Sequence, residues 1–401
     1  MIDAIGWLLF WPGHVFRQYF VRQTIDPKRI RSILFIQLDH FGDAVLSTGL
    51  LHWLKQRFPA ASLEVLCASW NQTLFESLSP ADHVNVVSET RFSRNGRWHW
   101  VRSLLMSAWR LRRRRYDLAI DARGELPHAV AMWLAGAKKR VGWSGGGGGF
   151  LLTHNVKFVP RRHEIASRAA IASRIAGKVV SESDVAPQVF SRQASLRAEA
   201  QPDLSGIANG AIALHIGAGT QAKTWPAESW SKLVGLMGRR ICRQILLLGG
   251  AKEQALASRI LAEHQQPDHI VDLTARLSVG QLPQVFAKCA MLVGADSGPA
   301  HLATACGVPV VSLFSGTNHS AQWRPWGDQV TLVSHPVECS PCHREVCPLA
   351  DHPCLQGITP ERVLAEILNE LDKQDRNPVG DDEKRKSKMR ISDRPIGVPI
   401  A

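Results

Sequence analysis

Short, continuous apolar runs alternate along this chain with longer segments in which apolar residues recur every three or four positions. Continuous runs of this length are typical of strands buried on both faces of a parallel sheet, and the longer spacing is typical of helices. The runs predict strands at residues 33–38, 63–67, 84–87, 116–121, 211–216, 244–250, 269–273, 291–296 and 308–314. Helices are predicted at residues 43–58, 227–236, 252–264 and 360–372, and an arginine-rich helix is predicted before residue 116.

This succession of strand, helix and strand occurs twice, which predicts an α/β protein with two doubly wound domains. A length of 401 residues agrees, because it exceeds what one ordinary core accommodates. We expect the domains at residues 30–190 and 205–372, joined through the polar stretch 186–210. Residues 1–29 form an N-terminal amphipathic extension, and the charged residues 373–401 are predicted to be a disordered tail.

The charge of the chain indicates an anionic partner. Lys and Arg outnumber Asp and Glu by 48 to 35, which gives a net charge of +13, while 45% hydrophobic residues exclude a chain disordered throughout. Nine arginines and no acidic residue lie between Arg91 and Arg115, together with Trp98, Trp100 and Trp109. Such a segment suits a phosphate-rich surface, either lipid headgroups or nucleic acid, because indole rings tolerate a half-wet boundary. A solvated helix face is the alternative.

No run approaches the roughly 18 apolar residues that a membrane-spanning helix needs, so we do not expect an integral membrane protein. An aromatic and aliphatic cluster nevertheless extends from Ile5 to Phe20, with Arg22 and Lys28 after it. A signal peptide would have its basic residues first. We interpret the segment as an interfacial amphipathic element of a cytoplasmic protein, with a packed N-terminal helix as the alternative.

Half of the eight cysteines are concentrated in one short segment, as Cys339, Cys342, Cys347 and Cys354. Their C-x2-C-x4-C-x6-C spacing is tight enough for a tetrahedral thiolate metal site. Three prolines interrupt the segment, and the spacing matches no standard zinc finger. A compact loop of reduced thiols is therefore favoured over a metal site, and we predict no other metal site.

Ligands of open parallel sheets bind beyond the carboxyl ends of the strands, so chemistry is expected in the loops that follow them. After the first strand, the sequence LDHFGD ends with Asp43 at a helix entrance facing the expected cleft. A carboxylate there can accept a proton from a substrate hydroxyl, although aspartate is also a common helix N-cap.

Two loops of the second half suit phosphate. The loop HIGAGTQAKTWP combines glycines with the hydroxyl of Thr220 and the charge of Lys223, and it matches neither the G-x-G-x-x-G nor the Walker A pattern. The loop GADSGPAH places Ser297 and Gly298 at a helix N-terminus, where backbone amides favour a diphosphate. His301 follows one turn later and either faces the same anion or is a core histidine.

Four segments in order resemble glycosyltransferase family 9, typified by the ADP-heptose:lipopolysaccharide heptosyltransferases. They are LDHFGDAVLSTGLL, HIGAGTQAKTWP, LGGAKE and VGADSGPAHLATACGVPVVSLFSGT, and the resemblance runs from about residue 30 to 370. The segment ECSPCHREVCPL also resembles one in family members of the heptosyltransferase II type. Two departures are Gln37, where an arginine is frequent, and the two ends of the chain, which lie outside the pattern.

The resemblance implies a GT-B architecture, in which two Rossmann-like domains face a central cleft. The acceptor would bind the N-terminal domain and the nucleotide sugar the C-terminal one. By matching positions, Asp43 would be the general base. The residues around the nucleotide diphosphate and sugar would be Thr220, Lys223, Glu253, Asp296, Ser297, Gly298 and His301. The loops at 145–149 and 315–322 would read the base and the sugar.

The predicted reaction is an inverting displacement that moves a heptose from a donor of the ADP-heptose type to a lipopolysaccharide core acceptor. No D-x-D motif occurs in the chain, so Lys223, the helix N-terminus and His301 are expected to stabilise the departing diphosphate without a metal. The donor is then a co-substrate, with no further cofactor. We expect a peripheral protein on the inner face of the cytoplasmic membrane, with no nucleic-acid partner.

The sequence is also compatible with two other functions. The chain could be another GT-B transferase that uses sugar nucleotides to build O-antigen or a different surface glycan. Alternatively, it could bind a nucleotide or a nucleic acid without catalysis, although no recognised nucleic-acid motif accompanies the charge.

Overall fold

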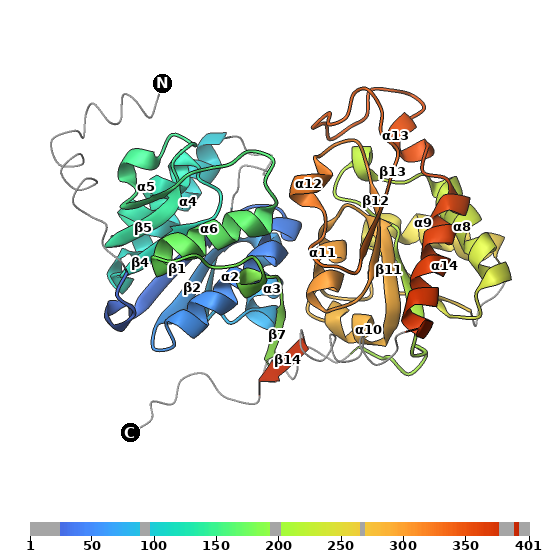
Figure 1. Cartoon of the computed structure of the whole chain (residues 1–401), viewed down its shortest axis with the longest axis horizontal. Coiled ribbons are helices and arrows are strands. Elements are labelled where there is room, and N and C mark those ends of the chain that lie inside the picture. Colours follow the sequence, from blue (N-terminus) through green and yellow to red (C-terminus); the bar gives the residue numbers. More distant parts are fainter. Residues whose placement is uncertain (1–24, 89–96, 193–201, 265–268, 377–388, 393–401) are drawn as a thin grey trace. The chain divides into compact units, whose positions relative to one another are not determined.

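The computed structural model of the chain describes residues 25–88, 97–192, 202–264, 269–376 and 389–392 (Figure 1). Contacts divide the chain into two compact units, with a boundary between Pro187 and Gln188. Most of the predicted N-terminal extension and most of the predicted disordered tail lie outside the described residues. Each unit is a layered α/β structure.

The first unit contains one sheet of six parallel strands in the order β3-β2-β1-β4-β5-β6. The strands are β1 (Ser32–Gln37), β2 (Ser62–Ala68), β3 (His83–Val87), β4 (Leu118–Asp121), β5 (Lys139–Trp143) and β6 (His154–Val156). The order reverses between β1 and β4, which lie side by side with Ile36 opposite Asp121. The carboxyl ends of these two strands form the topological switch point, where doubly wound sheets bind ligands.

Helices cover both faces of this first sheet. They are α2 (Phe41–Arg57), α3 (Gln72–Leu78), α4 (Arg97–Leu111), α5 (Leu126–Leu134) and α6 (Glu164–Ala176). The alternate strand residues Leu34 and Ile36 share a core with α4 and α5, while α2 and α6 pack against one another on the other face (Figure 1). Helix α2 also runs close to a neighbouring turn, since a Cβ at Gly49 would lie 2.1 Å from the carbonyl oxygen of Ala186.

The second unit repeats the same strand order, as β10-β9-β8-β11-β12-β13. Its strands are β8 (Ala211–His215), β9 (Ile245–Leu248), β10 (Ile270–Asp272), β11 (Cys289–Ala295), β12 (Val310–Phe314) and β13 (Val330–Ser334). The switch point of this sheet lies between β8 and β11. A separate pair of parallel strands consists of β7 (Val189–Arg192) and β14 (Met389–Ser392).

Helices again cover both faces of the second sheet. They are α8 (Ala227–Arg240), α9 (Gln254–Glu263), α10 (Leu282–Lys288), α11 (Gly298–Ala305), α12 (Ser320–Trp323), α13 (Pro353–Gln356) and α14 (Pro360–Arg376). Helices α8, α9 and α14 share one core with the sheet, and α10 and α11 lie on its other face (Figure 1). None of the helices in the described part of the chain is long and apolar enough to cross a membrane.

The predicted fold class is confirmed, since both units are doubly wound α/β structures and every predicted strand is present. The hydrophobic pattern missed the strands β5, β6, β7, β13 and β14 and the helices α3, α5, α6, α10, α12 and α13. Strand β14 lies within the segment that was predicted to be a disordered tail. Strand β5 begins with Lys139 and Arg140, and β6 has only three residues, so neither makes a continuous apolar run. The predicted end of the last helix at residue 372 was too early, because α14 continues through charged residues to Arg376.

Candidate functional site

Asp43 lies at the switch point of the first sheet, as the third residue of α2 directly after β1. The N-cap of α2 is His40, so Asp43 does not cap its own helix. Its side chain is only 7% exposed. Burial, followed by the nearby carboxylate of Asp39, raises the pKa of Asp43 to about 7, although Arg123 and Arg168 oppose the shift. A carboxyl group of this kind exchanges protons near neutral pH.

The loop after β4 brings a second set of charged groups to the same switch point. Asp121, the last residue of β4, accepts hydrogen bonds from the backbone amides of Arg123 (2.9 Å) and Gly124 (2.7 Å). Its Oδ1 also lies 3.0 Å from Nδ1 of His128 on α5. Both side chains are buried. Although burial opposes the charged forms, their attraction raises the pKa of His128 and lowers that of Asp121.

Arg123 connects this loop to the loop after β1. Its Nε lies 3.5 Å from Oδ1 of Asp39 and 3.4 Å from Oε1 of Glu125. The backbone oxygen of Asp39 in turn accepts hydrogen bonds from Nε1 of Trp70 (3.0 Å) and Nδ2 of Asn71 (2.8 Å). The guanidinium of Arg123 therefore lies close to two carboxylates, Asp39 and Glu125. The backbone of Asp39 is itself held in place by two hydrogen bonds.

A buried ion pair adds to the charges around Asp43. Arg168 and Glu164, one turn apart on α6, form an ion pair, and Nε of Arg168 donates to the hydroxyl of Ser47 on α2 (3.4 Å). Burying such charges is unfavourable unless they are paired. This pair lies close enough to Asp43 to influence its proton affinity.

The sequence predicted a role for Asp43, but not the charged groups that the structure places near it, Asp39, Asp121, Arg123 and His128. The signal was present, because the residues DARGE directly follow the predicted strand at 116–121, and loops after strands were expected to carry chemistry. The glycine-rich loop at 145–149 also approaches this edge. A Cβ at Gly146 would meet the carbonyl oxygen of Gly124, so the two backbones pass in close contact.

In the second unit, the loops after β8 and β11 are joined by an ion pair between two predicted site residues. Nζ of Lys223 lies 2.8 Å from Oδ2 of Asp296 and 3.3 Å from its backbone oxygen. Nδ2 of Asn318 is 3.4 Å from the same carboxylate oxygen. The family resemblance placed both Lys223 and Asp296 around the nucleotide diphosphate and sugar, without a contact between them. The structure instead makes Asp296 the group that positions Lys223.

Polar atoms at this second switch point are buried without a hydrogen-bond partner among the described residues. One is Oγ1 of Thr220, and another is Nδ1 of His215 at the end of β8. Burial lowers the pKa of His215 to about 4, so its ring is neutral near pH 7. Because buried polar groups are normally satisfied, the Thr220 hydroxyl is left free to hydrogen-bond a polar ligand, whereas the His215 ring also has a backbone hydrogen bond with Gly217.

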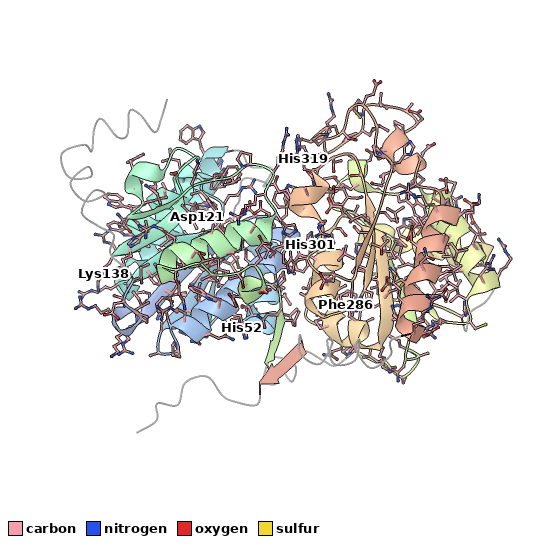
Figure 2. The ribbon with its side chains drawn as sticks, in the orientation of Figure 1. His52, Asp121, Lys138, Phe286, His301 and His319 are labelled. Atoms are coloured by element: carbon pink, nitrogen blue, oxygen red, sulfur yellow. The ribbon has the colours of Figure 1, made fainter. Side chains whose placement is uncertain are left out.

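Helix α11 begins at this edge with Gly298, and Ser297 is its N-cap. The Ser297 hydroxyl makes no capping hydrogen bond, so it is available to a ligand beside the amides of the first turn. His301 lies on α11 and is buried (Figure 2). Pro299 is the second residue of α11. The N–H groups of the first turn have no acceptor within the helix, so the missing N–H of proline removes no hydrogen bond there.

Glu253 lies over two glycines of neighbouring loops. A Cβ at Gly217 or at Gly249 would come within 2.7 Å of the Glu253 side chain. Its Oε2 accepts a hydrogen bond from the backbone amide of Gly250 (2.8 Å). The structure thus brings Glu253 to the loop after β8, which also carries Thr220 and Lys223.

The cysteine-containing segment contacts the same loops. The Ala222 amide donates to the Glu345 oxygen, and the Cys347 amide donates to Oε1 of Gln221, each over 2.9 Å. All four cysteines are free thiols. Among the residues that the structure describes, no three His, Cys, Asp or Glu side chains are arranged to hold a metal ion. The segment therefore supports the Thr220–Lys223 loop from outside.

The family model of glycosyltransferase family 9 (heptosyltransferase) matches residues 106–352, which is more than half of the chain. The chain belongs to glycosyltransferase family 9. The resemblance recognised from four sequence motifs is thereby confirmed.

Individual relatives of the chain are also named as heptosyltransferases. The chain is 32% identical over 149 residues to lipooligosaccharide heptosyltransferase 2 of Campylobacter jejuni, a match that covers 36% of this chain and about half, 46%, of that relative. It is 25% identical to lipooligosaccharide heptosyltransferase 2 of Haemophilus ducreyi, over 84% of this chain and 99% of that protein. The structure of the Escherichia coli ADP-heptose lipopolysaccharide heptosyltransferase II has the same fold, with a TM-score of 0.66, 22% identity and coverage of 86% and 99%.

Proposed function

We propose that this family 9 protein transfers a heptosyl group from a nucleotide diphosphate sugar, of the ADP-heptose type, to the core of a lipopolysaccharide. The first unit would hold the acceptor, and the second would hold the donor. The family match and the names of the relatives support the sugar and the acceptor class. The two switch points support the assignment of a role to each unit.

The observation that carries the proposal is the buried carboxyl group of Asp43. Its pKa of about 7 means that it is substantially ionised near neutral pH, yet it remains basic enough to accept a proton. In the proposed step, Asp43 removes the proton of an acceptor hydroxyl while that oxygen forms a bond to the anomeric carbon. The bond from this carbon to the diphosphate breaks, and the electron pair leaves with the nucleoside diphosphate. This single displacement inverts the anomeric configuration.

Negative charge develops on the departing diphosphate and must be balanced. We assign this role to Nζ of Lys223, to the hydroxyls of Thr220 and Ser297 and to the amides at the start of α11. The buried, unpartnered Oγ1 of Thr220 supports a donor at this edge, since a phosphate oxygen would satisfy it. Lys223 is held by Asp296 at 2.8 Å, so its charge is in place before the donor arrives. Glu253 and His301 complete the proposed donor site.

A fixed lysine and a helix N-terminus supply the charge that a D-x-D-bound metal supplies in other transferases. We therefore propose that catalysis needs no metal ion and no cofactor apart from the donor. A glycolipid acceptor would place the protein on the cytoplasmic side of the inner membrane, as a peripheral protein.

The test is a transfer assay with ADP-heptose and a heptose-deficient lipopolysaccharide core. We expect Asp43→Asn to lower kcat about 10²- to 10⁴-fold, because it removes the base without changing the shape of the side chain. Asp184→Asn, on the exposed surface of the same unit, is the matched control and should retain full activity. Chelators should leave the wild-type rate unchanged, and the product should have the inverted anomeric configuration.

A wild-type rate in Asp43→Asn would refute the base assignment but not the transfer itself. If no transfer occurs with any heptose donor while another sugar nucleotide reacts, the proposed substrate is wrong and the proposed catalytic arrangement stands.

A further inference from the structure

Helix α4 has two apolar faces, of which only one is buried in the first unit. Trp100, Leu104 and Ala108 pack into the core beneath the helix. Large apolar residues also line a second face of the helix: Trp98, Val101, Leu105, Met106 and Trp109. Val101 lies at the border of the two faces, since it also packs against the core. We call this second face the outer face of α4.

The three largest side chains of the outer face are open to solvent, while Val101 and Leu105 between them are half-buried. Trp98 is 84% exposed, Trp109 61% and Met106 45%. Together with Arg102 and Arg110, the outer face lines a shallow hollow of about 500 Å³. Isolated apolar residues on a surface are ordinary, but a contiguous stripe with two tryptophans exposes enough apolar area to indicate a binding surface.

The charged residues of α4 and of the turn after it are all of one sign. Residues 97–115 contain seven arginines and no aspartate or glutamate. Arg112 stands over the ring of Trp109, with its guanidinium carbon 5.5 Å from the ring centre, and donates a hydrogen bond to the oxygen of Leu134 (3.1 Å). Arg113 and Arg114 follow in the next turn and are exposed. An apolar stripe is therefore combined with a dense positive field.

We infer that the outer face of α4 docks on an anionic phospholipid bilayer, with Trp98, Met106 and Trp109 entering the interfacial region and the arginines binding lipid phosphates. This inference rests on the proposed function, since it names the surface that would hold the enzyme beside a glycolipid acceptor.

Each part of the outer face suits this partner. Indole rings favour the boundary between headgroups and acyl chains, and arginine pairs with phosphate through two parallel hydrogen bonds. Val101, Leu105 and Met106, between the tryptophans, are aliphatic and favour acyl chains over the flat bases of a nucleic acid, which stack on aromatic rings. Surface arginines add attraction to an anionic leaflet that weakens with salt.

The experiment measures co-sedimentation of the full chain with vesicles of phosphatidylcholine alone or with 30% phosphatidylglycerol. We expect wild-type protein to bind the anionic vesicles preferentially and salt-sensitively. The variant Trp98→Ser/Trp109→Ser should bind about tenfold or more weakly, with an unchanged circular dichroism spectrum. Val179→Ser, which removes a 91% exposed apolar side chain elsewhere in the same unit, is the apolar control and should bind like wild type.

A second pair of variants tests the charges. Arg102→Gln/Arg110→Gln should lose most of the preference for anionic vesicles. Arg239→Gln/Arg240→Gln removes the same charge from exposed positions at the end of α8 and should change binding little. Transfer to a soluble core oligosaccharide should remain at the wild-type rate in the tryptophan variant, while transfer to vesicle-embedded acceptor falls. This separation distinguishes loss of docking from failure of the proposed reaction.

Three outcomes would overturn the inference. One is undiminished vesicle binding by the tryptophan variant. Another is a wild-type dimer that the tryptophan variant abolishes, which would make a second copy the occupant of the outer face. The last is binding of single-stranded RNA, but not of vesicles, through the same residues.

Discussion

A single buried carboxyl group decides most of the proposed chemistry. Asp43 combines burial with a neighbouring carboxylate, Asp39, and two guanidinium groups oppose the resulting rise in its pKa. The balance leaves the pKa at about 7, whereas burial with no cation nearby would push it higher. In the proposed reaction, Arg123 and Arg168 would therefore act through the pKa of Asp43.

The same titration has opposite effects on activity and stability. An unfolded aspartate loses its proton near pH 3.8, but Asp43 keeps it up to about pH 7 in the folded protein. Between these values the folded state binds the extra proton, so the stability contributed by this group falls as the pH rises. The rate, which needs the ionised form, rises over the upper part of the same range.

We expect kcat/KM to increase with pH up to about 7 and then level off, because this ratio reports the pKa of the free enzyme. Asp43→Asn should remove this increase. Relative to wild type, it should also gain stability of about 1–3 kcal/mol between pH 4 and pH 8, because the amide cannot ionise. Denaturant unfolding at several pH values measures the second effect. Parallel pH dependence of stability in Asp43→Asn and wild type would contradict the assignment.

Asp43 and Lys223 could be proposed from sequence alone, because each closely follows an apolar run that predicts a strand. The sequence did not predict their surroundings. Lys223 pairs with Asp296, 73 positions along the chain, and Arg123 pairs with Asp39, 84 positions away. Such pairs depend on which strands become neighbours in the sheet, and the hydrophobic pattern does not specify strand order.

At the level of elements, the loop between β4 and α5 is held by one carboxylate. Asp121 receives two backbone amides and faces His128, so a single side chain orders the turn that carries Arg123. Gly124 in this turn has a φ of 84°, in the region where glycine is favoured. The turn therefore depends both on a glycine and on a charged hydrogen-bond acceptor.

Replacing Asp121 with Asn should loosen this turn. The amide keeps the size of the side chain but presents one acceptor oxygen and no charge, which leaves His128 without its partner. We expect a loss of about 1–3 kcal/mol in stability, together with faster hydrogen exchange at the amides of Arg123 and Gly124. Asp117→Asn, just before the same strand, is the control and should leave those two amides protected. Unchanged exchange in Asp121→Asn would mean that other contacts hold the turn.

The elements were predictable where apolar residues are continuous or evenly spaced. Helix α4 was expected from its spacing, but its two apolar faces look alike in the sequence. Which face is buried depends on packing against β1 and α5, and only the structure separates Trp100 in the core from Trp98 and Trp109 on the surface.

At the scale of the whole molecule, each unit has its own sheet and its own hydrophobic core. The proposed donor residues all lie in the second unit, and Asp43 lies in the first. Ligand binding stabilises the part of a protein that it contacts, so a nucleotide should act on one unit more than on the other.

We expect calorimetric unfolding to resolve two transitions, with ADP raising mainly the one that belongs to the second unit. At 100 times its Kd, a nucleotide adds about 2.7 kcal/mol to the stability of the unit it binds. Lys223→Ala should reduce the shift, because the diphosphate loses a cation. Lys232→Ala, exposed on α8 of the same unit, should leave it intact. An ADP shift confined to the first unit's transition would refute the donor assignment.

Both sheets follow one pattern of strand order, and the chain passes from the first unit to the second near Pro187. A genetic crossover at that point would keep each six-stranded sheet intact, because all the strands of one sheet would come from the same parent gene. Such a fold therefore tolerates the exchange of one unit between related genes. Residues 25–187 could then be exchanged for the matching half of a relative. Under the proposed division of roles, the chimaera would keep its donor and take a different acceptor, which would give evolution a route to new glycans without rebuilding the proposed donor site.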